Sequence, residues 1–164
     1  MKTKKPANLK TLRCNKIPIS LLIAGAAVAL YFAGAPASVL GYQRDSLCQA
    51  WRFLTCHCVH WNADHLFWSA GTFLTLGMVC ERASRARFLA CMGVSTLAIP
   101  AVLCLCMPEL STYGGLSGID SALFVLVIGT MLRERLAAHD RPLATAAGLM
   151  LIAFLGKTTY EFAT

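Results

Sequence analysis

Residues 111–129, STYGGLSGIDSALFVLVIG, place Ser117 between glycines directly before an apolar run. The run over residues 116–132 predicts a helix that enters a membrane. Ser117 has two interpretations at this point. As part of a small-residue face with Gly115, Gly118 and Ser121, it would let another helix approach closely. As a nucleophile, it would use the glycines to let a substrate backbone reach its hydroxyl. Taken alone, the stretch favours helix packing.

The composition predicts an all-α, polytopic membrane helix bundle. Of the 164 residues, 57% are hydrophobic and only 14% are charged, and the mean hydropathy is +0.59. A typical soluble domain has about 25% charged residues. Each apolar stretch is separated from the next by a short polar loop, and a membrane span needs about 20 apolar residues. The sequence predicts five spans, at residues 17–40, 54–79, 88–107, 116–132 and 143–155.

The charge pattern predicts the orientation and the domain organisation. The net charge is +7, and the basic residues gather before the first span, after the second and after the fourth. This alternation follows the positive-inside rule and places the N-terminus in the cytoplasm. Because no stretch interleaves basic residues with aromatics, a nucleic-acid partner is not expected. We expect a basic cytoplasmic segment at 1–16 and one membrane domain at 17–164. The N-terminus also has the pattern of a signal peptide, but the spans that follow favour an uncleaved first helix.

The start of the second predicted span is unusually polar, LTCHCVHWNADHLFWSAG. Ionisable groups inside a span are costly and usually functional. Alternatively, TCHCVHWNAD is an outer loop and the helix begins near Asp64, which would then be a capping or first-turn acid. In both cases His65 and Ser69 lie one turn apart on one helix face.

The cysteines and histidines do not predict a metal centre or a disulfide framework. The adjacent ligand types in CHC point in diverging directions, unlike the usual Cys-x-x-Cys or His-x-x-x-His spacing. We therefore expect no metal and no cofactor. Most cysteines lie in apolar stretches, where a free thiol acts as a small hydrophobe. Cys48 lies in a predicted outer loop and Cys106 at the outer end of the predicted span 88–107, and the sequence leaves open whether they pair.

The combination of motifs over residues 41–132 resembles the rhomboid family of intramembrane serine proteases. The motifs are a Trp-Arg pair in the first outer loop, two histidines in the second span, an acid that closes that span, and a Gly-x-Ser-Gly motif that opens the fourth. Trp51 and Arg52, His60 and His65, Glu81, and Gly115-Leu116-Ser117-Gly118 match these motifs in order. The stretch YGGLSGIDSALF and the short length are similar to the bacterial subgroup called rhombosortases.

The resemblance implies a role for each of these residues. Ser117 would be the nucleophile, with the backbone N–H of Ser117 and the side chain of His65 holding the oxyanion. A helix N-terminus suits this role, because its free N–H groups favour developing negative charge. Ser69 stands where the family often has asparagine and would be a shorter oxyanion donor. Trp51 and Arg52 are expected at the headgroup level, chiefly as an interfacial anchor.

The family's general base does not have a counterpart in the sequence. In the family it is a histidine on a sixth span, whereas His139 lies in a predicted inner loop. Three explanations remain open. The membrane domain is incomplete at its C-terminus and a further span carries the histidine, which we favour; the chain is an inactive relative; or His60 or His65 serves as the base.

The resemblance implies a serine endopeptidase that cleaves membrane-anchored proteins at or near a C-terminal transmembrane anchor, which in the rhombosortase subgroup follows Gly-Gly. The expected partners are transmembrane protein substrates and membrane lipid. The expected location is a bacterial inner membrane, with the active site facing the outer side. The alternative is a pseudoprotease that binds transmembrane helices without cleaving them. A metal or solute transporter would rest on CHCVH alone.

Overall fold

The computed structural model describes residues 17–163, so the predicted basic segment 1–16 lies outside the described residues. Five long helices dominate the fold: α1 (Ile19–Phe32), α4 (Ala63–Ala83), α5 (Arg85–Cys106), α6 (Ser117–Ala137) and α7 (Arg141–Ala163). The predicted all-α bundle is confirmed. α5 and α7 are long and apolar enough to cross a membrane, and α1 is a shorter apolar helix. α4 and α6 have 21 residues each, which is a spanning length, but carry more polar side chains.

The connection between α1 and α4 is a folded loop rather than a simple turn. It contains α2 (Ala37–Leu40), β1 (Tyr42–Gln43), α3 (Arg52–Thr55) and two 3₁₀ turns, η1 (Arg44–Ser46) and η2 (Cys56–Cys58). β1 pairs antiparallel with β2 (Thr112–Tyr113), with Tyr42 opposite Tyr113. Because β2 lies just before α6, this pairing holds the loop beside the start of that helix.

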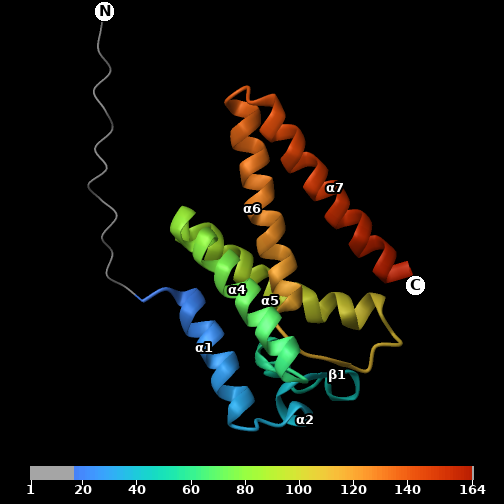
Figure 1. Ribbon diagram of the computed structural model, residues 1–164. Helices are drawn as coiled ribbons and strands as arrows, with labels where there is room; N and C mark the ends of the chain where they lie inside the picture. Colours follow the sequence, from blue (N-terminus) through green and yellow to red (C-terminus); the bar gives the residue numbers. More distant parts are fainter. Residues whose placement is uncertain (1–16, 164) are drawn as a thin grey trace, which may run out of the picture.

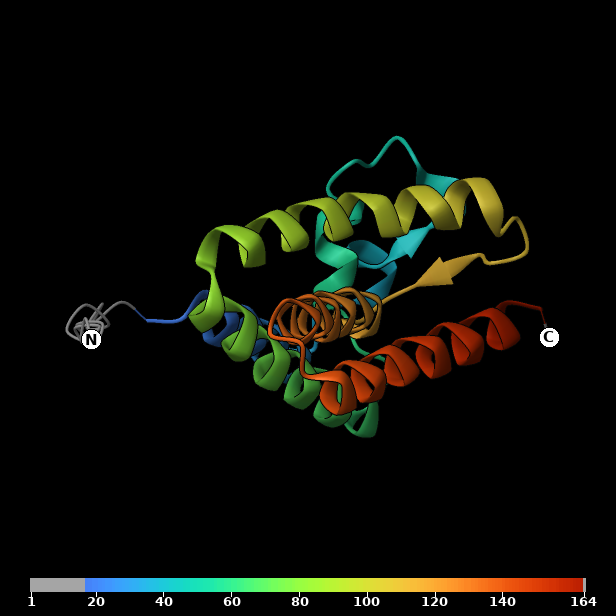
Figure 2. The same ribbon diagram turned by 90° about the horizontal axis from the view of Figure 1, so that it is seen from above.

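The centre of the bundle is α6, which packs against α4, α5 and α7, while α1 packs on the far side of α4. Figure 2 shows α6 between its neighbours, with α7 diverging from it toward the C-terminus. α7 is less enclosed than α5: 11% of its most apolar stretch is buried, against 22% for α5. The core between α1, α4 and α6 contains both small and large apolar side chains, including Ala24, Ala27, Phe73 and Leu123.

The predicted first span, 17–40, is wrong at its C-terminal end. α1 stops at Phe32 because Gly34 adopts φ +66 and donates its N–H to Tyr31 O, which is typical of a glycine that ends a helix. Pro36 then begins a separate short helix, α2. The residues after Phe32 belong to the connecting loop, so α1 itself has 14 residues.

The predicted second span, 54–79, is wrong over its first half. α4 begins at Ala63, because the side chain of Asn62 accepts the N–H of His65 at 2.7 Å and caps the helix. His57 lies in η2, and His60 lies in the extended segment between η2 and α4. The alternative in which the helix begins near Asp64 is confirmed, and Asp64 is in the first turn, where an acid favours the helix dipole.

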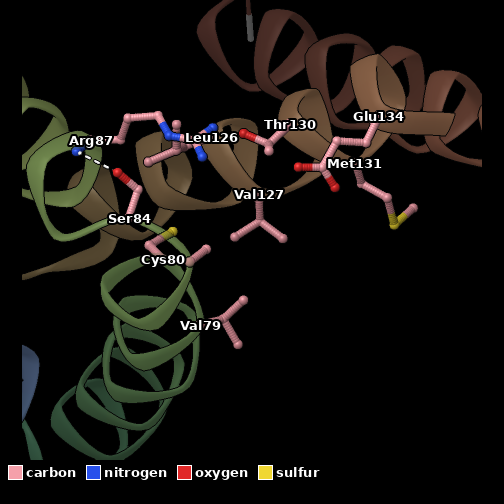
Figure 3. A pocket seen from close by; sticks show the side chains of 10 residues that line it. Val79, Cys80, Ser84, Arg87, Leu126, Val127, Thr130, Met131 and Glu134 are labelled. Carbon is pink, nitrogen blue, oxygen red and sulfur yellow. Dashed lines mark hydrogen bonds between the residues drawn. The ribbon is translucent and has the colours of Figure 1, made fainter. Parts of the chain in front are cut away.

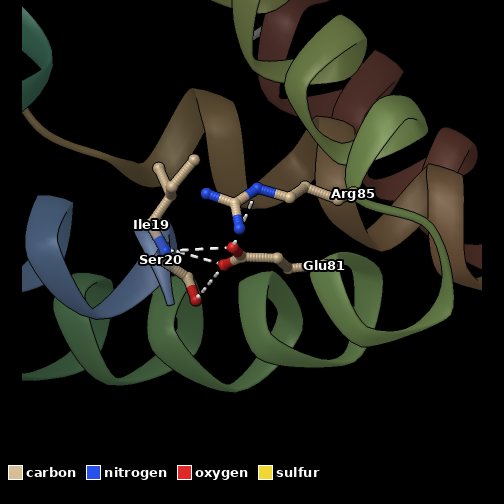
Figure 4. A network of polar contacts seen from close by, with 4 residues as sticks. All are labelled: Ile19, Ser20, Glu81 and Arg85. Atoms are coloured by element: carbon tan, nitrogen blue, oxygen red, sulfur yellow. Dashed lines mark hydrogen bonds and ion pairs between the residues drawn. The ribbon is translucent and has the colours of Figure 1, made fainter. Parts of the chain in front are cut away.

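Glu81, near the end of α4, caps the start of α1. Its carboxylate accepts hydrogen bonds from the N–H of Ile19 at 3.0 Å, the N–H of Ser20 at 3.1 Å and the hydroxyl of Ser20 at 3.1 Å, as Figure 4 shows. Arg85 lies 3.8 Å from the same carboxylate. The first N–H groups of a helix have no partner inside it, so Glu81 joins the beginning of α1 to the end of α4. The two ends meet at the side of the bundle where α4 is drawn in light green (Figure 1).

We expect Glu81→Gln to destabilise the bundle by about 1.5–3 kcal/mol, the range for hydrogen bonds to a charged group. The amide has one acceptor oxygen and no charge, so it cannot serve all three donors. Urea unfolding of the detergent-solubilised protein would measure the loss. Glu161→Gln is the matched control, because its ion pair with Lys157 is exposed and should contribute little. Equal effects of both substitutions would contradict the capping role.

Candidate active site

Ser117 is the first residue of α6 and is exposed. The helix begins here because Gly115 adopts φ +119, a conformation that side-chain-bearing residues rarely reach, and Leu116 then turns the chain into helical geometry. The N–H groups of the first helical turn point out of the helix end. Ser117 therefore carries its hydroxyl beside backbone donors and at the positive end of the helix dipole.

The glycines before Ser117 lie against η2 and the segment that follows it. The N–H of Gly115 donates to Cys56 O at 2.9 Å. A Cβ on Gly114 would be 3.1 Å from Val59 O, so the two backbones are in close contact there. This contact fixes the position of Ser117 relative to the segment that carries His57 and His60.

His65 lies directly beside the glycine loop. A Cβ on Gly115 would be 2.7 Å from His65 Cε1 and 2.8 Å from His65 Nε2, so the imidazole edge rests on the Gly115 backbone. The position of His65 is set by the first turn of α4, where Asn62 holds its backbone N–H. The loop before α6 and the start of α4 thus place the His65 ring against Gly115. Gly115 precedes Ser117 by two residues in the chain.

His60 packs behind His65. The two ring centroids are 5.0 Å apart with the planes at 61°. His60 is 7% exposed, and neither of its ring nitrogens has a hydrogen-bond partner among the described residues. Burial, with the neighbouring His65 ring as the second cause, lowers the pKa of His60, so the ring is neutral near pH 7.

Ser69 is one turn below His65 on the same face of α4, as predicted, but its hydroxyl has another partner. Ser69 is buried, and its Oγ donates to Asp120 Oδ2 at the long distance of 3.5 Å. Its hydroxyl thus has a partner on α6, and the assignment of Ser69 as an oxyanion donor stays a prediction.

Asp120 was not predicted as a site residue. It lies one turn after Ser117 and is 8% exposed, and its Oδ1 is buried without a hydrogen-bond partner among residues 17–163. The sequence did contain a signal for it, since an acid inside an apolar helix is costly and usually functional. Tyr113, whose phenol oxygen contacts Gly115 O and the N–H of Gly118, was also not predicted. Its position in a polar turn of the sequence offered no comparable signal.

Three of the predicted supporting residues lie away from Ser117. Arg52 is buried rather than at a headgroup surface, and donates to Gly41 O at 2.8 Å, Ser38 O at 2.8 Å and Gln49 Oε1 at 2.6 Å. It holds the loop between α1 and α4 together, which corrects its assignment as an anchor. Trp51 is half exposed just before α3, in keeping with an interfacial side chain. Glu81 caps α1 at the opposite end of α4.

A separate hollow lies at the other end of the bundle. It has a volume of about 170 Å³ and lies between the ends of α4 and α6 and the start of α5 (Figure 3). Thr130 of α6 lines it, 13 residues after Ser117, which corresponds to about 20 Å along a helix. This hollow is therefore not part of the arrangement around Ser117. Cys48 and Cys106 are both free and exposed in this structure.

The arrangement therefore gathers Ser117, Gly115, Gly118, His65 and His60 at one end of a helical membrane bundle. A family model described as the Rhomboid domain matches residues 47–162. The chain belongs to the rhomboid family. The comparison with curated proteins returned no match. The matched range includes His60, His65 and the whole of α6.

Rhomboid proteins are intramembrane serine peptidases that act on transmembrane protein substrates, together with inactive relatives of the same fold. The chain is accordingly an integral membrane protein. The site combines an exposed serine at a helix N-terminus with an imidazole that rests on Gly115, two residues before it; acyl transfer uses such a pairing of a nucleophile with nearby oxyanion donors.

Proposed function

We propose that this rhomboid protein is an intramembrane serine endopeptidase with Ser117 as its nucleophile. The observation that carries the proposal is the position of Ser117 at the exposed start of α6, with the edge of His65 against Gly115. Ser117 Oγ would attack the carbonyl carbon of the scissile peptide while its proton passes to a base. The C–N bond then breaks, the amine leaves with that proton, and water hydrolyses the acyl ester to restore Ser117.

The oxyanion would be held by the N–H of Ser117 and by the ring of His65. The N–H belongs to the first turn of a 21-residue helix and is aimed away from it. His65 is fixed through Asn62 at the start of α4, so its ring keeps its place as charge develops on the substrate oxygen. Removing one such donor typically lowers kcat by about 10²–10³-fold.

The reaction also requires a base within hydrogen-bond reach of Ser117 Oγ. His65 is assigned to the oxyanion in this proposal, and His60 is buried behind it. The proposal therefore names no base among residues 17–163.

The substrates that we propose are proteins held in the membrane by a C-terminal transmembrane anchor that follows Gly-Gly, as in the rhombosortase subgroup. Support comes from the resemblance of YGGLSGIDSALF to that subgroup. A scissile bond flanked by glycines would suit this site, because the substrate backbone must approach the glycines around Ser117 closely. The bacterial inner membrane, with the N-terminus in the cytoplasm and Ser117 toward the outer side, is the matching location.

A fluorophosphonate probe tests the nucleophile directly. We expect the purified protein in detergent to form a covalent adduct that peptide mass spectrometry locates on Ser117, because an activated serine is phosphonylated while ordinary serines are not. Ser121, one turn along the same helix, is the internal control: its hydroxyl donates to Ser117 O at 3.1 Å. No adduct, or equal labelling of both serines, would contradict the proposal.

The second candidate function is a pseudoprotease that binds transmembrane helices. It is favoured by one observation: the hydrogen bonds among residues 17–163 do not include one between the hydroxyl of Ser117 and an imidazole. A pseudoprotease would retain anchored proteins without cleaving them and would take no fluorophosphonate label. The same probe therefore separates the two functions.

A further inference from the structure

Tyr113 belongs to β2 and places its phenol oxygen between the two glycines that flank Ser117. The oxygen donates its hydrogen to Gly115 O at 3.3 Å and accepts the N–H of Gly118 at 3.3 Å. The phenol oxygen thus bridges the backbone on both sides of Ser117, from the residue two before it to the residue directly after it.

The space for the phenol exists only because residue 118 is glycine. A Cβ at that position would be 2.8 Å from the Tyr113 oxygen and 2.9 Å from Ile99 Cδ1, closer than real Cβ atoms approach such groups. The second glycine of Gly-Leu-Ser-Gly thus has a definite partner, and that partner is the tyrosine four residues before the serine.

The surroundings of Tyr113 hold its ring in place. Its strand pairs with β1, and its ring packs beside the cluster formed by Tyr42, Cys56 and Leu103. The His57 ring lies edge-on to it, with centroids 6.1 Å apart, and His57 Nε2 is 3.1 Å from Thr96 O on α5. Burial raises the pKa of Tyr113, opposed by the N–H of Gly118 and the Ser117 hydroxyl, so the phenol keeps its proton at neutral pH.

We propose that Tyr113 is a positioning residue for the nucleophile: by bridging Gly115 O and the N–H of Gly118, its phenol oxygen fixes the backbone that carries Ser117 at the first turn of α6. This inference rests on the proposed function, because positioning has a catalytic meaning only if Ser117 reacts. Tyr113 does not take the proton of Ser117, since its own proton remains bound. It keeps the Ser117 backbone, and with it the N–H that is proposed to hold the oxyanion, in one position while the hydroxyl reacts.

Tyr113→Phe removes only the phenol oxygen, and Tyr42→Phe is a matched control. Tyr42 lies directly opposite Tyr113 in the β pair, and its hydroxyl is buried without a hydrogen-bond partner among the described residues. With the fluorophosphonate probe we expect Tyr113→Phe to lower the maximal inactivation rate about tenfold, in the range of one lost hydrogen bond, while the half-saturating probe concentration stays unchanged. Tyr42→Phe should match the wild type in both constants.

A double-mutant cycle on unfolding supplies a measurement that does not depend on activity. We expect the shift in thermal midpoint of Tyr113→Phe with Gly118→Ala to fall short of the sum of the single shifts, because removing the phenol oxygen also removes the atom that a Cβ on residue 118 would meet at 2.8 Å. Additive shifts, or an unchanged inactivation rate in Tyr113→Phe, would overturn the inference. If the wild type takes no label while the cycle still shows coupling, the proposed function fails, and Tyr113 is reduced to a structural cap without a positioning role.

Discussion

Ser117→Ala is expected to abolish cleavage of an anchored reporter by this protein, with a loss of at least about a thousandfold. Removing a serine nucleophile from a hydrolase eliminates the acyl-enzyme route and leaves only what binding and the oxyanion site provide. A suitable reporter carries a folded soluble domain, Gly-Gly, and a C-terminal transmembrane anchor. Release of the soluble domain from membranes, followed by immunoblotting, measures the rate.

Ser121→Ala is the matched control for this substitution. Ser121 is on the same helix, and its hydroxyl donates to the Ser117 carbonyl, so the change removes a neighbouring hydroxyl but not the nucleophile. We expect near wild-type release from this variant. A reporter with Leu-Leu in place of Gly-Gly tests the substrate class in the same assay. Full release by Ser117→Ala would remove the basis for the protease assignment.

The fold class could be predicted from the sequence because it depends on composition and length, which describe whole segments. The helix boundaries, by contrast, depend on single residues, whose effect an average over a whole segment does not show. Gly34 ends α1 eight residues before the end of the predicted first span, and Asn62 starts α4 nine residues after the start of the predicted second span. Both residues carried recognisable signals of a helix end. Hydropathy over a long window averages such signals away.

The gathering of Ser117, His65 and the glycines could be predicted from motif order, whereas their individual contacts could not. The sequence does not distinguish an arginine that faces lipid headgroups from one that binds the carbonyls of a buried loop. Only the fold shows that the partners of Arg52 are Gly41 O and Ser38 O. Tyr113 becomes relevant through a pairing with β1, about 70 residues earlier in the chain. Contacts between segments so far apart leave no local pattern.

The second large effect is expected at Gly115. A methyl group on this residue would be 2.7 Å from His65 Cε1 and 2.8 Å from His65 Nε2. The neighbour that must move is an imidazole packed on the His60 ring, 5.0 Å away between centroids, so the displacement cannot be taken up by a flexible side-chain end. Alanine would also hold φ at +119 only with strain, which costs about 1–3 kcal/mol.

We therefore expect Gly115→Ala to lower both fluorophosphonate labelling and reporter cleavage by about a hundredfold or more, in the range of one lost oxyanion donor. Gly129→Ala, in the middle of the same helix, is the control. A Cβ there meets no heavy atom within 4 Å, and alanine favours a helix over glycine by up to about 1 kcal/mol. This variant should keep its activity and unfold slightly later. If Gly115→Ala retains activity, the ring of His65 is not needed where the structure places it, and the oxyanion role assigned to it is wrong. If activity is lost while the variant still unfolds cooperatively, with its midpoint lowered only as far as the strain at residue 115 accounts for, the loss comes from the site rather than from unfolding, as the contact between Gly115 and His65 requires.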